Sequence, residues 1–240
     1  MPSECLKDID VVILAGGLGT RISSVLKTTP KILAPVRGRP YLVFLLSWLK
    51  SFGARRLVFG LGHLAGAVSN FLEKNPLEGI EYVTVIERAP LGTAGAIGNL
   101  LSEVSSNPVL ILNGDSFVDA DLCQFVNFHR FEKSEASIIC TNVGDTSRFG
   151  LINLVKGNRV SSFQEKTESA GSGLISTGVY LFGREILDEI AICGPSLEKD
   201  FFQNQPAERL AAMCGEYTFL DIGTPKDLDH ASLILSNHIF

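Results

Sequence analysis

The sequence predicts an α/β fold, with a doubly wound and mostly parallel sheet, helices on both faces and a small mixed β extension. Three observations carry this prediction. Short apolar runs alternate with amphipathic helical segments between residues 11 and 133. The apolar runs are continuous, as in strands that are buried on both faces. From about residue 136, short strands separated by glycine and asparagine turns replace this alternation.

Length and composition narrow the classes of protein that fit. The 240 residues are compatible with one domain, which we divide into halves at about 9–135 and 136–240. A net charge of −5 argues against a nucleic-acid-binding protein. No apolar run reaches the roughly 18 residues of a membrane span, and the polar first ten residues lack a signal-peptide core.

The five cysteines show neither a C-x-x-C pair nor zinc-ligand spacing. We therefore expect free thiols in a reducing compartment, and hence a cytoplasmic protein.

The first predicted strand, residues 11–14, runs into a turn with glycines at 16, 17 and 19. Glycines let backbone N–H groups approach an anion closely. Arg21 and Lys31 add two cations, and prolines at 30, 35 and 40 exclude one continuous helix. The stretch therefore suggests a polyphosphate site, with an ordinary tight turn as the alternative. It lacks the P-loop ending and the last glycine of the dinucleotide-binding pattern.

The next segments continue the alternation. A helix is predicted over 41–52 because leucines recur at 42, 45, 46 and 49, and Gly53 ends it. A strand over 57–61, a helix over 63–72 and a strand over 80–86 follow. His63 has no carboxylate partner in the pattern, so a cap or surface role competes with a catalytic one.

The strand over 80–86 opens into a second glycine-containing turn, residues 87–96, followed by a helix. Free N–H groups at that helix start would suit an anion, although an ordinary capped turn fits equally. The strand over 109–112 ends in Asn113, Gly114 and Asp115. A carboxylate at the end of a parallel strand is placed to hold Mg²⁺, with a turn or cap as the alternative. Asp121 is the expected N-cap of a helix over 122–133.

The second half is expected to contain strands over 137–141, 150–154, 160–163 and 174–182 and short helices over 186–192 and 197–202. A last strand over 217–220 leads into Asp221, and a helix from Pro225 to Ser236 follows.

The opening pattern Gly-Gly-x-Gly-Thr-Arg, followed by Pro-Lys-x-Leu-x-Pro-Val, resembles that of sugar-1-phosphate nucleotidylyltransferases. The resemblance implies a Rossmann-like sheet of the nucleotidyltransferase type, with a nucleotide-binding first half and a sugar-binding second half. It gives catalytic roles to Arg21, Lys31 and Asp115. The nucleotide-binding residues that it implies are Leu14, Ala15, Gly16, Gly17, Gly19, Thr20, Glu87, Pro90, Gly92 and Thr93.

Four further segments resemble the family: Arg148–Gly150, Phe163–Lys166, Gly173–Tyr180 and Asp221–Pro225. The resemblance implies Mg²⁺ held by Asp115 and Asp221. It implies sugar-phosphate contacts from Asn113, Gly150, Glu165, Lys166, Ser176 and Thr177. Ser176 stands where relatives usually have asparagine, so the contact of that amide is in question.

Within the family, the chain resembles most the short heptose-1-phosphate guanylyltransferases. The implied reaction joins a nucleoside triphosphate, GTP, to D-glycero-α-D-manno-heptose 1-phosphate and releases pyrophosphate. Mannose, glucose or N-acetylmuramate 1-phosphate with GTP, UTP or TTP is one alternative, and a non-catalytic nucleotide-sensing regulator is another. The expected partners are these small molecules, with no nucleic acid and no membrane. The sequence leaves the oligomeric state open, a homodimer included.

Overall fold

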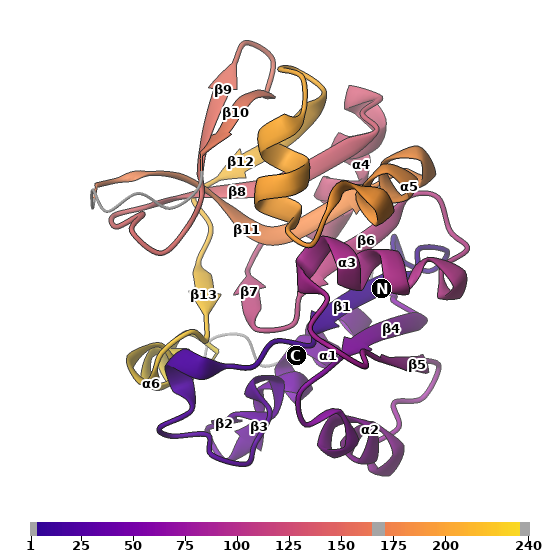
Figure 1. Cartoon of the computed structure of the whole chain (residues 1–240), viewed down its shortest axis with the longest axis vertical. Helices are drawn as coiled ribbons and strands as arrows, with labels where there is room; N and C mark the ends of the chain where they lie inside the picture. Colours follow the sequence, from indigo (N-terminus) through magenta and orange to yellow (C-terminus); the bar gives the residue numbers. More distant parts are fainter. Residues whose placement is uncertain (1–3, 165–170, 236–240) are drawn as a thin grey trace.

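The computed structural model describes residues 4–164 and 171–235. Within them, nine strands form one twisted sheet in the order β5-β4-β1-β6-β11-β8-β12-β10-β9 (Figure 1). The predicted α/β class is confirmed, and the strands of the predicted mixed extension continue the same sheet.

The first half supplies the parallel part of the sheet. Val12 of β1 lies in register between Val58 of β4 and Ile111 of β6. The strands are β1 (Val11–Ala15), β4 (Arg56–Leu61), β5 (Glu81–Ile86) and β6 (Val109–Asn113). The helices between them are α1 (Tyr41–Ser51), α2 (Ala65–Lys74) and α3 (Gly92–Asn99). The strands and α1 lie within one residue of the predicted ranges. Helix α2 begins and ends two residues later than predicted, after Leu64 in the left-handed region. Helix α3 is the helix expected after the second glycine-containing turn, for which no bounds were predicted.

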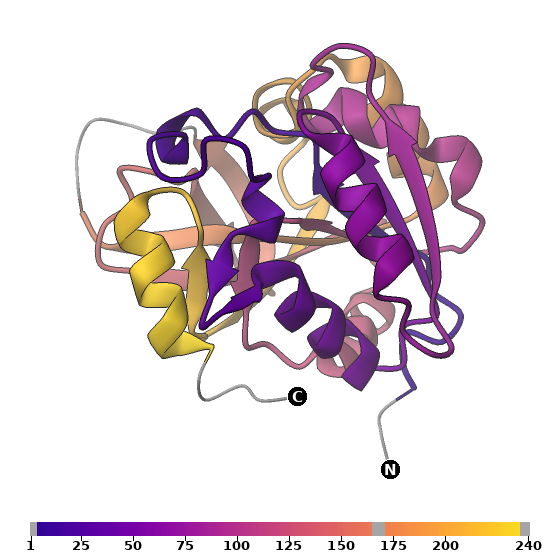
Figure 2. The same cartoon turned by 90° about the horizontal axis from the view of Figure 1, so that it is seen from below.

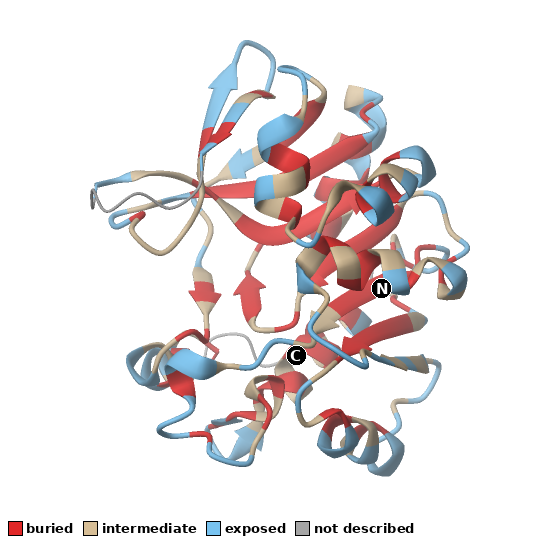
Figure 3. Cartoon of the chain, in the orientation of Figure 1, coloured by how far each residue is buried: buried red, intermediate tan, exposed pale blue. Residues whose placement is uncertain are grey.

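Both faces of the sheet are covered, which explains why its strands are apolar at consecutive positions. Val11 and Ile13 pack into one buried cluster with α1, α2 and α4 (Leu122–Glu132). Val12 packs into the other cluster with α3 and α5 (Arg184–Cys193). The central strands are accordingly buried along most of their length in Figure 3. Alternate residues of one strand thus serve two cores.

The second half enters the sheet through an antiparallel strand. The long strand β11 (Gly173–Phe182) pairs antiparallel with both β6 and β8 (Ala136–Val143). At the far edge, β9 (Leu151–Val155) and β10 (Arg159–Gln164) form a hairpin. Strand β12 (Leu210–Gly215) pairs parallel with β8 and was not predicted from the sequence. Its Ala-Ala-Met-Cys-Gly core has little of the β-branched character that predicts strands.

The predicted last strand is shorter than expected and lies outside the main sheet. Strand β13 (Phe219–Asp221) pairs antiparallel with β7 (Ser116–Val118), a strand that the sequence analysis missed. Helix α6 (Pro225–Ile234) follows it and lies beside the early segment that carries β2 (Pro35–Val36) and β3 (Arg39–Pro40) (Figures 1 and 2). The chain's late residues are thereby brought back to its first loop.

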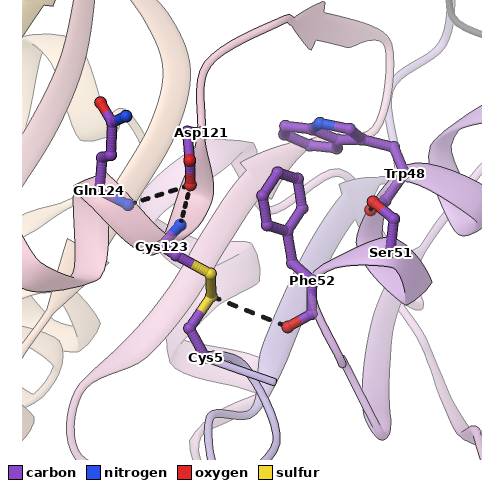
Figure 4. Close-up of a disulfide and its surroundings, with 7 residues drawn as sticks. All are labelled: Cys5, Trp48, Ser51, Phe52, Asp121, Cys123 and Gln124. Atoms are coloured by element: carbon purple, nitrogen blue, oxygen red, sulfur yellow. Dashed lines mark hydrogen bonds between the residues drawn. A yellow bond between two sulfur atoms is a disulfide. The ribbon is translucent and has the colours of Figure 1, made fainter. Parts of the chain in front are cut away.

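The prediction that all five cysteines are free is wrong. Cys5 and Cys123 form a disulfide, with Cα atoms 5.4 Å apart (Figure 4). Cys140, Cys193 and Cys214 are free. The two bonded residues are 118 positions apart, so no local motif could indicate the pairing. Asp121 caps α4 as predicted, since its Oδ1 accepts from the N–H groups of Cys123 and Gln124 at 2.7 and 3.1 Å.

Across residues 4–164 and 171–235, every helix is too short or too polar to cross a bilayer.

Candidate active site

Three adjoining cavities meet at Asp115 in the described part of the chain. The triphosphate-side cavity, about 240 Å³, is lined by the glycine turn, Arg21 and Lys31. The base-side cavity, about 470 Å³, lies between the glycine turn and residues 87–96. The sugar-side cavity, about 360 Å³, is lined by β11, residues 148–150 and Asp221. Asp115 lines all three, so one carboxylate borders each of the spaces that a nucleotide and a second substrate would need.

Lys31 lies between two carboxylates from distant parts of the chain. Its Nζ is 2.5 Å from Asp115 Oδ2 and 3.6 Å from Asp221 Oδ1. The Ile222 N–H donates to the Asp115 carbonyl at 2.9 Å, which ties the end of β13 to the end of β6. Burial, and then the negative charge of Asp115, raise the pKa of Asp221, while Lys31 and Arg148 oppose this rise. The two carboxylates therefore repel one another and depend on nearby cations.

Arg148 is the second cation at this pair, and the sequence analysis gave it no role. Its Nη2 donates to Asp221 Oδ2 at 2.6 Å, and its Nη1 donates to Asp227 Oδ1 at 3.0 Å. Burial alone would lower the pKa of Arg148, but the two carboxylates raise it overall. A Cβ on Gly223 would lie 2.2 Å from Arg148 Nη2, so this contact requires glycine there. The Arg-Phe-Gly motif could have indicated a role for Arg148, but only Gly150 of this motif was predicted as a site residue.

The chemistry of this donor set fits a divalent cation that arrives with its substrate. No cluster of three or more histidine, cysteine, aspartate or glutamate side chains capable of holding a metal is found within the described ranges. Mg²⁺ is commonly held by one or two carboxylates together with substrate phosphates, rather than by a complete protein cage. Asp115 and Asp221 satisfy that requirement.

The glycine turn is packed tightly against the neighbouring strand exits. A Cβ on Gly62 would lie 2.5 Å from the Gly16 carbonyl oxygen, and one on Gly16 would lie 2.7 Å from Glu87 Oε1. Gly19 takes a φ of 60°, in the left-handed region. Glu87 accepts from the Leu91 N–H at 3.3 Å, and burial raises the pKa of its carboxyl group. The glycines thus bring Glu87 to the wall of the base-side cavity.

At the start of α3, where the sequence allowed either an anion site or an ordinary capped turn, one N–H group is already engaged within the fold. The Ala94 N–H donates to the Pro195 carbonyl at 3.0 Å. Gly92 has a φ of 74°, and a Cβ there would lie 2.2 Å from the same carbonyl oxygen. A loop of the second half therefore covers this helix end, and its contact was invisible from the local sequence.

Asn113 and the segment 176–178 lie side by side in the lining of the sugar-side cavity. A Cβ on Gly178 would lie 2.5 Å from Asn113 Nδ2, so the amide packs on a bare backbone. Ser176 Oγ donates to Tyr180 Oη at 3.2 Å and accepts from the Gly178 N–H at 3.2 Å. Thr177 donates its hydroxyl to the Ile139 carbonyl at 3.0 Å, so that oxygen is already engaged within the fold.

The structure brings the predicted site residues together. Residues of the glycine turn and the first loop line the triphosphate-side cavity: Leu14, Ala15, Gly17, Gly19, Thr20, Arg21 and Lys31. Others line the base-side cavity: Gly16, Glu87, Pro90, Gly92, Thr93 and Asn113. The sugar-side cavity is lined by Gly150, Ser176, Thr177 and Asp221. Glu165 and Lys166 lie outside the described residues. Glu198, Tyr180 and Arg148 also line the sugar-side cavity and had not been predicted as site residues.

Two of the known proteins that are similar in sequence to this chain are guanylyltransferases. The chain is 33% identical over 224 residues to a D-glycero-alpha-D-manno-heptose 1-phosphate guanylyltransferase of Campylobacter jejuni, covering 92% of this chain and 98% of that protein. It is 31% identical to a mannose-1-phosphate guanylyltransferase of Mycobacterium tuberculosis, covering 93% of this chain but only 64% of the relative's length.

Two solved structures of one protein are similar to this chain in both fold and sequence. The crystal structure of HddC from Yersinia pseudotuberculosis superposes with a TM-score of 0.84 at 31% identity, covering 95% of this chain and 99% of that chain. A second structure of HddC, complexed with GMP-PN, has a TM-score of 0.83. The family model described as nucleotidyl transferase matches residues 10–237. The chain therefore belongs to the nucleotidyl transferase family.

Proposed function

We propose that this protein transfers a guanylyl group from GTP to a sugar 1-phosphate, with D-glycero-α-D-manno-heptose 1-phosphate as the preferred acceptor and Mg²⁺ as the cofactor. The relative of Campylobacter jejuni, which aligns along nearly its whole length, supports the acceptor, and the GMP-PN complex of HddC supports the nucleotide. The observation that carries the proposal is the meeting of Lys31, Asp115 and Asp221 where three cavities join. The product would serve as an activated heptose for surface polysaccharide synthesis.

The reaction joins two polyanions. An oxygen of the sugar 1-phosphate attacks the α-phosphorus of GTP, the α–β bridging bond breaks, and pyrophosphate leaves with that electron pair. The attacking oxygen is already anionic near neutral pH, so this step needs no general base. Catalysis then consists of positioning and charge neutralisation.

Individual residues of this chain would have distinct roles in this reaction. Arg21 and Lys31 border the triphosphate-side cavity and would stabilise charge on the triphosphate. Arg148 borders the sugar-side cavity, where it holds Asp221 in place. Bound Mg²⁺, held by Asp115 and Asp221, would supply Lewis-acid stabilisation of phosphate oxygens.

A second candidate is mannose 1-phosphate as the acceptor with the same nucleotide. The relative of Mycobacterium tuberculosis favours it at a similar identity, although this chain spans 64% of that protein's length. The acceptors heptose 1-phosphate and mannose 1-phosphate differ in few atoms, so the two candidates share one site chemistry.

The test is a panel of GTP, UTP, TTP and CTP against heptose, mannose, glucose and N-acetylmuramate 1-phosphates, read by pyrophosphate release. We expect the highest kcat/KM for GTP with heptose 1-phosphate, and loss of turnover when EDTA removes divalent ions. Turnover of UTP with glucose 1-phosphate, together with no turnover of GTP, would overturn the assignment.

A second test is the variant Asp115→Asn, which should lower turnover on the order of a hundredfold or more. If the wild-type protein binds GTP but releases no pyrophosphate with any acceptor, the regulator alternative is favoured instead.

A further inference from the structure

The sugar-side cavity is lined by a carboxylate, Glu198, for which no role was predicted. Glu198 lies on η4 (Leu197–Phe201), a single π-helical turn in the loop that covers the start of α3. Its side chain lines the cavity together with Tyr180 and Ser176. Arg21, Arg148 and the carboxylate pair line the same cavity. The cavity is therefore lined by both cations and carboxylates.

One oxygen of Glu198 is held rigidly. Thr93 Oγ1 donates to Glu198 Oε2 at 3.1 Å, and Ser196 Oγ donates to the same oxygen at 3.2 Å. The Leu197 N–H in turn donates to Thr93 Oγ1 at 2.8 Å, which orients the threonine hydroxyl. Since both donors converge on Oε2, the carboxylate has a fixed orientation without any ligand.

The other oxygen, Oε1, has no hydrogen-bond partner among residues 4–164 and 171–235, and no lysine or arginine of these ranges forms an ion pair with Glu198. Burial, and then the negative charge of Glu198, raise the pKa of Tyr180, in keeping with the proximity of these two side chains. A half-buried carboxylate oxygen of this kind accepts hydrogen bonds from hydroxyl groups and repels phosphate.

We propose that Glu198 is a specificity-determining residue that accepts a hydrogen bond from a ring or side-chain hydroxyl of the acceptor sugar. This inference rests on the proposed function, because it assigns the sugar-side cavity to a sugar 1-phosphate. The repulsion between Glu198 and phosphate would also orient the acceptor, so that its phosphate faces Arg148 and Arg21.

Thr93 links this contact to the nucleotide. It lines both the base-side and the sugar-side cavities, and its hydroxyl is one of the two donors that hold Glu198. Thr93 therefore holds Glu198 at the border between the two cavities.

The first test compares Glu198→Gln and Glu198→Ala with wild type. A hydrogen bond to a charged group contributes enough that kcat/KM for the sugar phosphate should fall on the order of 10- to 100-fold. The KM for GTP should stay within about twofold, because the lost contact is made to the other substrate. Glu185→Gln, an exposed residue on α5, is the matched control and should behave as wild type. An equal loss for both substrates would overturn the inference and point to a structural role for Glu198. If the alanine variant fails to fold, the glutamine variant still tests the inference.

The second test pairs each enzyme with monodeoxy sugar 1-phosphates. One deoxy position should weaken the substrate strongly with wild type and hardly at all with Glu198→Ala, because the variant has already lost that contact. If every deoxy analogue loses the same factor with both enzymes, Glu198 does not read a hydroxyl.

Direct calorimetric binding of sugar 1-phosphates to wild type and Glu198→Gln separates this inference from the proposed function. Without any turnover in wild type, weaker binding to the variant would retain the role of Glu198 while the guanylyltransferase proposal fails. Equal binding to both proteins would overturn the role of Glu198, whether or not the enzyme turns over.

Discussion

At the scale of single residues, the site is organised by charges that neutralise one another. Asp115 and Asp221 approach Lys31, and Arg148 joins Asp221 to Asp227. Asp227 is also held by the Thr224 hydroxyl at 2.7 Å, in the first turn of α6. Arg148 thus connects the 145–150 loop to both a site carboxylate and the C-terminal helix.

Arg148→Met should lower the free energy of unfolding by roughly 1–3 kcal/mol, because it leaves two half-buried carboxylates without their shared donor. Urea denaturation of wild type, Arg148→Met, Asp227→Asn and the double variant gives the coupling energy. We expect the double variant to be less destabilised than the sum of the single variants. Strict additivity would show that the Arg148–Asp227 contact contributes nothing.

His129 should make the protein less stable in acid. It is buried on α4, with its Nδ1 2.8 Å from Ser137 Oγ. Burial, and then Arg130, lower its pKa to about 4 from the usual 6.5. The unfolded chain therefore binds the proton first, so this contribution to stability is complete above pH 6.5 and is lost as the pH falls toward 4.

In urea denaturation, wild type should lose stability relative to His129→Gln between pH 6.5 and pH 4, by at most about 1.4 kcal/mol per pH unit. The exposed His63→Gln is the control for the effect of a histidine-to-glutamine substitution as such. A constant difference between wild type and His129→Gln would show that His129 does not titrate below its usual range.

At the scale of elements, the start of α3 shows how one turn can serve both halves of the chain. Gly92 allows the Pro195 carbonyl to approach and to accept the Ala94 N–H. The same loop continues into η4, which carries Glu198. The turn after β5 therefore positions groups at the base-side cavity and at the sugar-side cavity together.

Gly92→Ala should destabilise the protein by at least about 1 kcal/mol, because its left-handed φ disfavours a side chain and its Cβ would collide with Pro195. It should also raise the KM for the sugar phosphate, since the displaced loop carries Glu198. Gly66→Ala is the matched control in α2, where a Cβ would meet nothing within 4 Å, and it should stabilise by about 0.5–1 kcal/mol. Thermal denaturation and initial rates report both effects. Equal behaviour of the two variants would contradict the docking of the 194–198 loop.

At the scale of the whole molecule, two connections join distant parts of the chain. The β13–β7 pair brings Asp221 beside Asp115 and leads into α6, next to the first loop. The Cys5–Cys123 disulfide joins the segment before β1 to the start of α4. The first connection brings the two site carboxylates together, and the second covalently joins the start of the chain to α4.

Reduction of the disulfide, or Cys5→Ser, should lower the free energy of unfolding by about 2–5 kcal/mol, because the bond closes a long loop in the unfolded chain. Denaturation with and without dithiothreitol measures this, and Cys193→Ser is the control that leaves the bond intact. Alkylation and mass spectrometry of the non-reduced, unfolded protein should modify Cys140, Cys193 and Cys214 only. Modification of all five cysteines would show that the bond does not form.

The sequence alone determined the order of the main-sheet strands and of their helices in the first half, and the residues that gather at the strand ends. These features follow from local periodicity and from glycines whose backbone conformation no other residue adopts easily. The glycine turn, Lys31 and Asp115 stood out in the local pattern, whereas Asp221 was implied by the family resemblance, and the structure places all of them around adjoining cavities. Their catalytic roles remain predictions.

Only the tertiary structure decided which distant groups meet. Local patterns carry no information on the pairing of Cys5 with Cys123, the approach of Arg148 to Asp221, or the occupation of the Ala94 N–H by Pro195. Strand β12 escaped prediction for the same reason, because its alanines form a strand only when β8 and β10 pair with it. The spacing of residues that are near in sequence predicts local secondary structure. Contacts between distant residues depend instead on how the sheet and its loops pack together in the folded chain.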